Sequence, residues 1–142
     1  MPGNSNNPTS VSLDVRNFSS EAPWVNVSGS NGAPYSYLYT GGNAPGNKNN
    51  GDCDFSIGGG NAAITLNLVA DQRYQIDLIT FVNDTAPPQL STQGNAPRTR
   101  VINNQCTAKL PPGTDDTRYK VRVVDTGAGN ATVQCDPVII NK

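Results

Sequence analysis

Residues 118–135, with the sequence RYKVRVVDTGAGNATVQC, decide the fold. Tyr119, Val121 and Val123 alternate with basic side chains, as in a strand with one buried face and one solvent-exposed face. The Asp, Gly and Asn residues of 125–130 are typical of a tight turn, and residues 131–135 form a second, shorter strand pattern. The stretch predicts a β-hairpin.

The same period of two recurs along the chain, and no segment keeps a helical period. The alternating apolar positions lie within residues 11–15, 25–27, 35–39, 53–57, 64–68 and 74–78. Clusters of Gly, Pro and Asn separate these runs. The pattern predicts an all-β fold, a single immunoglobulin-like antiparallel β-sandwich of about eight or nine strands, with a closed barrel as the alternative.

A length of 142 residues suits one domain. Residues 1–9 form a polar, proline-containing stretch that we expect to be a disordered tail, and residues 10–142 form the sandwich domain. The chain begins without the basic and apolar regions of a signal peptide, and no apolar run reaches the ~20 residues of a membrane helix. We therefore expect a soluble cytoplasmic protein, or a secreted or surface protein if the chain is a trimmed mature form.

The charge and the residue types exclude several classes of function. The net charge is −1 and charged residues make up 15% of the chain, so neither a nucleic acid nor a membrane is an expected partner. The chain has no histidine, which removes His-based acid–base catalysis and most zinc sites. We expect no enzyme, cofactor or metal. Low net charge favours self-association.

Basic residues recur on two predicted strands. We interpret them as solvated strand faces rather than as a basic stripe; they are Arg98, Arg100, Arg118, Lys120 and Arg122.

The three cysteines, Cys53, Cys106 and Cys135, are far apart in the sequence and form no CxxC pair. Each falls on the apolar side of a predicted strand, where a thiol behaves as a small hydrophobic group. We expect three buried free thiols, with one disulfide and one free thiol as the alternative.

One motif points to a chemistry. Val123-Val124-Asp125-Thr126-Gly127-Ala128 resembles the active-site motif of retroviral-type aspartic proteases, in which each subunit of a homodimer supplies one aspartate. In that family a flap and a supporting loop follow the motif, and residues 129–142 are too few to form them. The favoured interpretation is a turn, and a protease using Asp125-Thr126-Gly127 is a remote alternative.

The end of the chain carries a second resemblance. Asp136-Pro137-Val138-Ile139-Ile140-Asn141, preceded by the aromatic-x-Val-x-Val pattern of residues 119–123, resembles the ending of small, mostly uncharacterised bacterial β-sandwich proteins of the DP-EP-like or inclusion-body-protein-like kind. The resemblance implies an immunoglobulin-like sandwich without an assigned activity and identifies no catalytic residue.

Four aromatic residues are the candidate binding site. Tyr35, Tyr37 and Tyr39 share one strand face, and Trp24 precedes them by a short interval. An exposed ladder would stack on a sugar or anchor a protein, whereas a buried ladder would be part of the core. We predict a non-enzymatic binding or self-association module with an uncharged polar, tyrosine-bearing surface, whose partner is a protein such as a second copy. The alternative is a carbohydrate-binding module.

Overall fold

The computed structural model describes residues 8–42, 53–55, 57–81, 87–107, 119–135 and 139–141. Over these residues the regular structure is all β except for one 3-10 turn, η1 (Thr126–Ala128). The strands are β1 (Thr9–Arg16), β2 (Val25–Ser28), β3 (Pro34–Gly41), β4 (Cys53–Phe55), β5 (Ala62–Leu68), β6 (Tyr74–Phe81), β7 (Leu90–Gln93), β8 (Thr99–Asn104), β9 (Tyr119–Asp125), β10 (Ala131–Cys135) and β11 (Ile139–Asn141).

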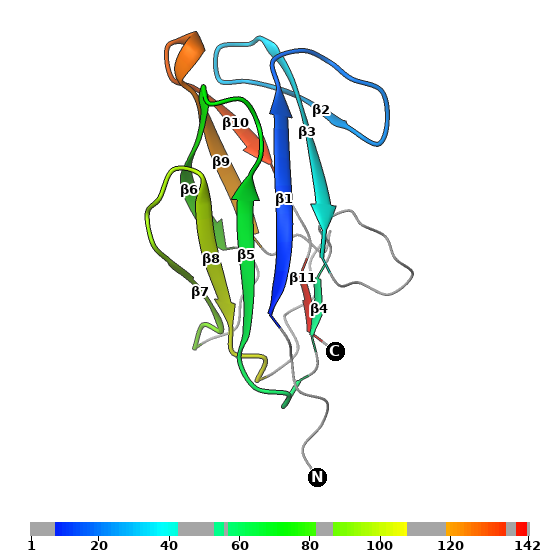
Figure 1. The fold of residues 1–142 in the computed structure, drawn as a ribbon, viewed down its shortest axis with the longest axis vertical. Helices are drawn as coiled ribbons and strands as arrows, with labels where there is room; N and C mark the ends of the chain where they lie inside the picture. The colour runs from blue at the N-terminus through cyan, green and yellow to red at the C-terminus, as the bar shows by residue number, and fades with distance from the viewer. Residues whose placement is uncertain are drawn as a thin grey trace.

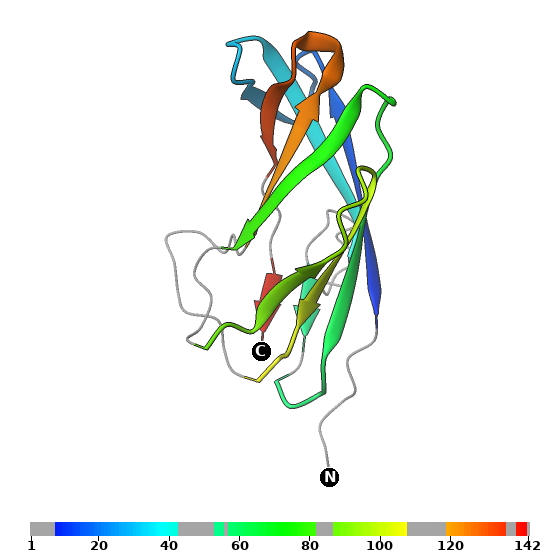
Figure 2. The ribbon, with the colours of Figure 1, turned by 90° about the vertical axis from the view of Figure 1, so that its left-hand side faces the viewer.

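The strands form two packed layers, which confirms the predicted all-β sandwich (Figures 1 and 2). One layer is a six-stranded sheet in the order β2-β3-β1-β5-β8-β7, and the other is a three-stranded sheet in the order β10-β9-β6. A short pair, β11-β4, forms a third sheet.

Two strand pairs depart from the antiparallel arrangement. β1 lies between β3 and β5 and runs parallel to β5, and β4 runs parallel to β11. The period-two pattern reports which face of a strand is buried, but it carries no information on the direction of the neighbouring strand. The direction of these pairs therefore became visible only in the structure.

The hairpin predicted for residues 118–135 is present. β9 pairs antiparallel with β10, with Val123 opposite Val133. The connection is η1, which Asp125 caps, followed by Gly129 and Asn130 with φ of 64° and 62°. These positive φ values need residues that tolerate the left-handed conformation, and Gly and Asn are the usual choices.

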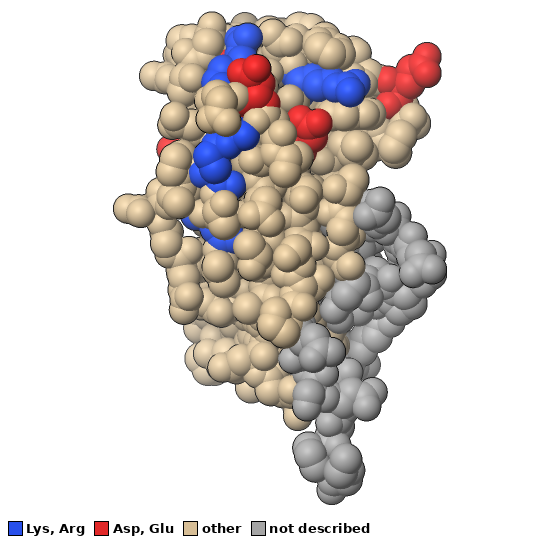
Figure 3. Space-filling view, viewed as in Figure 1, with Lys and Arg blue, Asp and Glu red and all other residues tan. Residues whose placement is uncertain are grey.

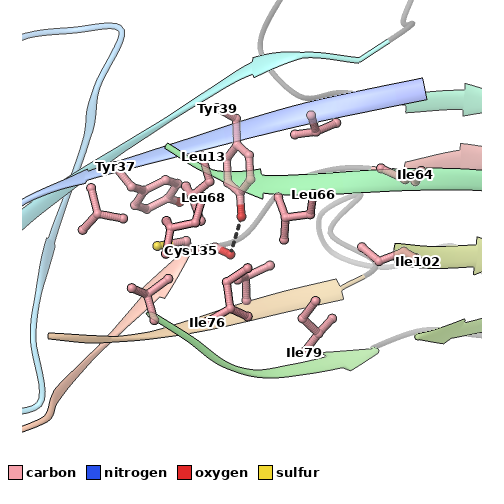
Figure 4. Close-up of a cluster of buried hydrophobic side chains, with 14 of the residues drawn as sticks. Leu13, Tyr37, Tyr39, Ile64, Leu66, Leu68, Ile76, Ile79, Ile102 and Cys135 are labelled. Atoms are coloured by element: carbon pink, nitrogen blue, oxygen red, sulfur yellow. Dashed lines mark hydrogen bonds between the residues drawn. The ribbon is translucent and has the colours of Figure 1, made fainter. Parts of the chain in front are cut away.

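The core lies between the inner faces of the two sheets. Its apolar side chains alternate along each strand with solvent-facing polar residues, as in most sandwiches. Figure 4 shows Leu13 and Leu66 from the six-stranded sheet facing Ile76 and Ile79 of β6. Cys53, Cys106 and Cys135 are buried free thiols, as predicted.

Arginine side chains join the two sheets at the β8–β6 corner. The Arg98 guanidinium donates to the main-chain carbonyls of Ala70, Asp71 and Tyr74, and Arg100 donates to that of Ile76 at 3.0 Å. The interpretation of Arg98 and Arg100 as a solvated face is wrong, because both side chains are half-buried and donate to main-chain carbonyls of neighbouring segments. Of the other basic residues, Arg122 pairs with an exposed Asp77, Lys120 is exposed, and Arg118 lies outside the described residues.

Strand β1 begins at Thr9, so the ordered sheet starts inside the stretch predicted as a tail, and residues 1–7 lie outside the described residues. In the part of the chain that the structure covers, no helix is long and apolar enough to span a bilayer.

Candidate functional site

The three tyrosines are buried, with exposed fractions of 1% for Tyr35, 8% for Tyr37 and 6% for Tyr39. Their face of β3 is the one that meets the three-stranded sheet. Large rings gain more free energy from burial than the small outward side chains would, provided that the hydroxyl groups find acceptors. Tyr39 donates to the Cys135 carbonyl at 3.0 Å (Figure 4). The prediction that these tyrosines form a contact surface is therefore wrong.

Tyr35 contacts a polar cluster in the interior. Its hydroxyl donates to Asp125 Oδ2 at 2.7 Å, and Asp125 is completely buried. Arg73, from the loop between β5 and β6, donates to the same carboxylate through Nε at 2.7 Å and Nη2 at 3.0 Å. The Gly127 N–H adds a further bond to Oδ1 at 3.0 Å. The carboxylate therefore ties together both sheets and the β5–β6 loop.

All three residues of the Asp-Thr-Gly motif serve to hold Arg73. Asp125 binds its guanidinium, and Thr126 donates to its carbonyl from both N–H (2.8 Å) and Oγ1 (2.7 Å). Gly127 leaves the space that the guanidinium fills, because a Cβ there would lie 2.7 Å from Arg73 Cζ. The motif forms a cradle for an arginine at the end of the sandwich where η1 meets the β5–β6 loop (Figure 1).

The electrostatics of this cluster favour the ionised form of Asp125. Burial alone would raise the pKa of Asp125, but hydrogen bonds from Arg73, Tyr35 and Gly127 outweigh it and hold the pKa below its usual value. Burial and the bond to Asp125 raise the pKa of Tyr35, and burial raises the pKa of Tyr74 to about 12. An aspartic protease needs a carboxylate that shares a proton with a second carboxylate. The contacts of Asp125 within the described residues are instead donors.

A different aromatic group lies on the outer face of the six-stranded sheet. The guanidinium carbon of Arg16 lies 3.8 Å from the centroid of the Trp24 ring and 5.5 Å from that of Phe18. Trp24 is partly exposed, and Phe18 is 52% exposed. We call Arg16, Phe18 and Trp24 the Trp24 surface. It contains the one predicted site residue that is accessible.

Local hydrogen bonds fix the loop that carries this surface. Asn26 of β2 accepts from the Ser20 N–H at 2.8 Å and donates to the Ser20 carbonyl at 3.0 Å. The Ser36 hydroxyl of β3 donates to the Phe18 carbonyl at 2.7 Å. The Trp24 N–H closes a turn on the Glu21 carbonyl at 3.1 Å. The aromatic rings are therefore held on a defined backbone.

A shallow hollow lies beside β2 and the loop that precedes it. Its volume is about 420 Å³. Its lining is mainly uncharged; the residues are Ser19, Asn26, Val27, Ser28, Gly32 and Pro34. Asn26 lines the hollow and also bonds Ser20, so the hollow lies close to the loop that carries Phe18 and Trp24.

Beyond the Trp24 surface, the outer face of the six-stranded sheet is polar and almost without charge. Asp14 and Arg16 point outward from β1, because Leu13 and Val15 are buried. The next outward positions across the sheet carry short hydroxyl and amide side chains, with Ser12 paired to Thr40 on one side and to Asn67 on the other. In Figure 3 the charged side chains gather in the upper part of the face, and the described surface below them carries none. The uncharged polar surface expected from the composition is present here, but without the tyrosines.

Sequence reasoning missed Arg16 and Phe18 and gave no role to Arg73. Arg16 lies at the outward end of a clearly patterned strand, which was the available signal, but its contact with Trp24 depends on the path of the intervening loop. Arg73 precedes a strand without any local pattern that would mark it as the partner of Asp125.

A second hollow of about 410 Å³ lies on the outer face of the three-stranded sheet, next to η1. It is lined by Gln75, Ile76, Asp77, Val124, Thr126, Asn130 and Thr132, without an exposed aromatic ring. Over the residues with described positions, no group of three or more Cys, Asp or Glu side chains is arranged to hold a metal ion.

Comparison with known proteins gives no family. No protein-family model matches the chain, and no curated protein is significantly similar to it.

Proposed function

We propose that this protein is a non-enzymatic binding module that holds a carbohydrate on the Trp24 surface. The observation that carries the proposal is the combination of a partly exposed Trp24, an exposed Phe18 and an Arg16 guanidinium, next to a hollow lined by Ser and Asn side chains. Aromatic faces pack against the apolar C–H faces of sugar rings, and short polar side chains form hydrogen bonds with their hydroxyl groups.

The outer face of the six-stranded sheet adds support, because its hydroxyl and amide side chains continue from the Trp24 surface along β1, β3 and β5. Such groups both donate and accept hydrogen bonds, as sugar hydroxyls do. A chain of several sugars would therefore find matching groups beyond the aromatic end.

Two other roles have less support. Catalysis by Asp125 would need a carboxylate able to exchange protons, whereas Asp125 is buried and bound by Arg73, Tyr35 and Gly127. Self-association by strand pairing would need a long free edge. Strands β2 and β7 have only four residues each, and Ser30 occupies the main-chain groups of Thr132 on the five-residue edge strand β10. On the eight-residue edge strand β6, Pro97 and Arg100 occupy the main-chain groups of Ile76.

Binding to a panel of soluble neutral polysaccharides, followed by affinity electrophoresis and calorimetry, tests the proposal. Trp24→Ala should weaken the binding about tenfold, because both the exposed part of the indole and the ring that holds the Arg16 guanidinium are lost. Leu78→Ala is the matched control, since it removes an exposed apolar side chain from the opposite sheet. The proposal fails if no polysaccharide is bound, or if Trp24→Ala binds as tightly as Leu78→Ala.

A further inference from the structure

We infer that the ligand is a neutral sugar with vicinal hydroxyl groups, and that Arg16 and Asp14 together select it. The inference rests on the proposed function and names the class of sugar that the Trp24 surface would take.

Arg16 supplies the donors. A guanidinium has five N–H groups in a planar fork, and stacking on an aromatic ring leaves its edge open. The Arg16 guanidinium uses one nitrogen on the Ser20 hydroxyl at 3.3 Å, and within the described residues it has no carboxylate partner. Two adjacent N–H groups can then bind two adjacent oxygens of a ligand, either those of a carboxylate or those of a vicinal diol.

Asp14 decides between these two ligands. It faces outward from β1 two residues before Arg16, so the two Cα atoms are about 7 Å apart along the strand. Its Oδ1 accepts from the Val15 N–H at 2.9 Å, and Oδ2 has no partner among the described residues. A sugar hydroxyl can accept from Arg16 while a neighbouring hydroxyl donates to Asp14. A ligand that binds Arg16 through a carboxylate would instead bring a second negative charge close to Asp14 and would place no donor beside it from that group.

The surrounding charge favours the same choice. Glu21, whose main-chain carbonyl accepts from the Trp24 main-chain N–H, is a further exposed acidic residue of the same loop. In Figure 3 acidic and basic side chains lie close together in the upper part of the face. An anionic ligand bound by Arg16 would therefore meet the Asp14 carboxylate two residues away on the same strand face, within a Debye length of about 10 Å. A neutral ligand meets no such repulsion.

The test uses neutral polymers and acidic versions of the same polymers. Soluble (1→4)-linked glucan, mannan and galactan oligosaccharides keep adjacent hydroxyls at C2 and C3, and oxidation at C6 converts each repeat to a uronate without changing the linkage. A (1→3)-linked glucan has the same sugar as the first polymer but lacks vicinal hydroxyls within its chain. We expect at least one neutral (1→4)-linked polymer to bind at least five times more tightly than its oxidised form and than a (1→3)-linked polymer.

Variants assign this selectivity to the two residues. Asp14→Asn should reduce the preference for the neutral polymer to less than twofold, because it removes the repelling charge. Arg16→Lys should weaken binding of the neutral polymer about tenfold, since an ammonium lacks the fork. Asp77→Asn, on the opposite sheet, is the charge-matched control. It should change neither the preference for the neutral polymer nor the affinity for it.

The outcomes separate this inference from the proposed function. Binding that depends on Trp24 but prefers the uronate or the (1→3)-linked chain overturns the inference and leaves the carbohydrate-binding role intact. The inference also fails if Asp14→Asn and Arg16→Lys behave as Asp77→Asn does. Absence of binding to every polymer overturns both.

Discussion

At the scale of single residues, the surroundings of Asp125 determine its role. The carboxylate has no exposed surface and accepts bonds from a guanidinium, a phenol and a main-chain N–H. Such an array stabilises the charged form and leaves no lone pair directed at a substrate. The Asp-Thr-Gly sequence that positions a catalytic aspartate in a protease here positions Arg73.

Asp125→Asn should destabilise the fold by about 2–4 kcal/mol, because it leaves the donors of the cluster facing an uncharged amide in a buried place. Asp77→Asn should cost at most about 1 kcal/mol, since the Asp77–Arg122 pair is exposed. Urea denaturation of both variants measures the difference. Equal losses would contradict a structural role for Asp125.

Stability should fall in acid through the same residue. The pKa of Asp125 is lower in the folded protein than its unfolded value of about 3.9. Its contribution is therefore complete above about pH 4 and is lost as the pH falls through the depressed folded pKa. Thermal melting between pH 2 and pH 7 should show a smaller fall of the melting temperature in acid for Asp125→Asn than for the wild type. Parallel curves would exclude Asp125 as a source of the pH dependence.

At the scale of elements, η1 is a docking point for the loop between β5 and β6. Thr126 binds the Arg73 carbonyl twice, and Asp125 binds the Arg73 side chain. Gly129 gives the left-handed residue that ends the turn, at a position where a Cβ would meet open space. The two glycines of the hairpin thus have different physical roles.

Gly127→Ala should displace Arg73 from Asp125, because the added Cβ would lie 2.7 Å from the guanidinium carbon. Gly129→Ala should cost about 1–2 kcal/mol through backbone strain alone. A double-mutant cycle with Arg73→Gln distinguishes the two, since Gly127→Ala should add little once Arg73 is shortened, whereas the cost of Gly129→Ala should stay unchanged. Additive effects of Gly127→Ala and Arg73→Gln would contradict the claim that Gly127 leaves the space for the Arg73 guanidinium.

Which elements could be predicted depended on how local their signals were. The alternation of Tyr119, Val121 and Val123 and the turn residues after it gave the hairpin correctly, because both signals lie within a few residues. The burial of Tyr35, Tyr37 and Tyr39 could not be read from the same alternation, since period two separates two faces of a strand without saying which one meets the other sheet. The contacts of Arg16 and Arg73 join segments distant in sequence, and no local pattern marks them.

At the scale of the whole molecule, hydrogen bonds from side chains join the two sheets, in addition to the packing of their strands. Arg98 and Arg100 join β8 to β6, and Asp125 joins the end of β9 to Tyr35 of β3. The thiols of Cys53, Cys106 and Cys135 lie inside this closed core. Burial raises the pKa of Cys106 to about 11, so little thiolate is present at neutral pH.

Thiol titration should therefore show almost no reaction in the native protein at pH 8, because the reagent reaches a buried thiol only when the fold opens. The same protein in urea should react at all three cysteines. One reactive thiol in urea would indicate a disulfide, and rapid native reaction would contradict the burial of the core.

The most direct test of the proposed role is to locate the ligand on the surface by NMR. Titration of the protein with the tightest-binding neutral oligosaccharide should shift the indole N–H of Trp24 and the amides of Ser20 and Asn26 more than any others. Shifts that centre instead on Gln75, Val124 and Thr132, around the hollow of the opposite sheet, would contradict the assignment of binding to the Trp24 surface.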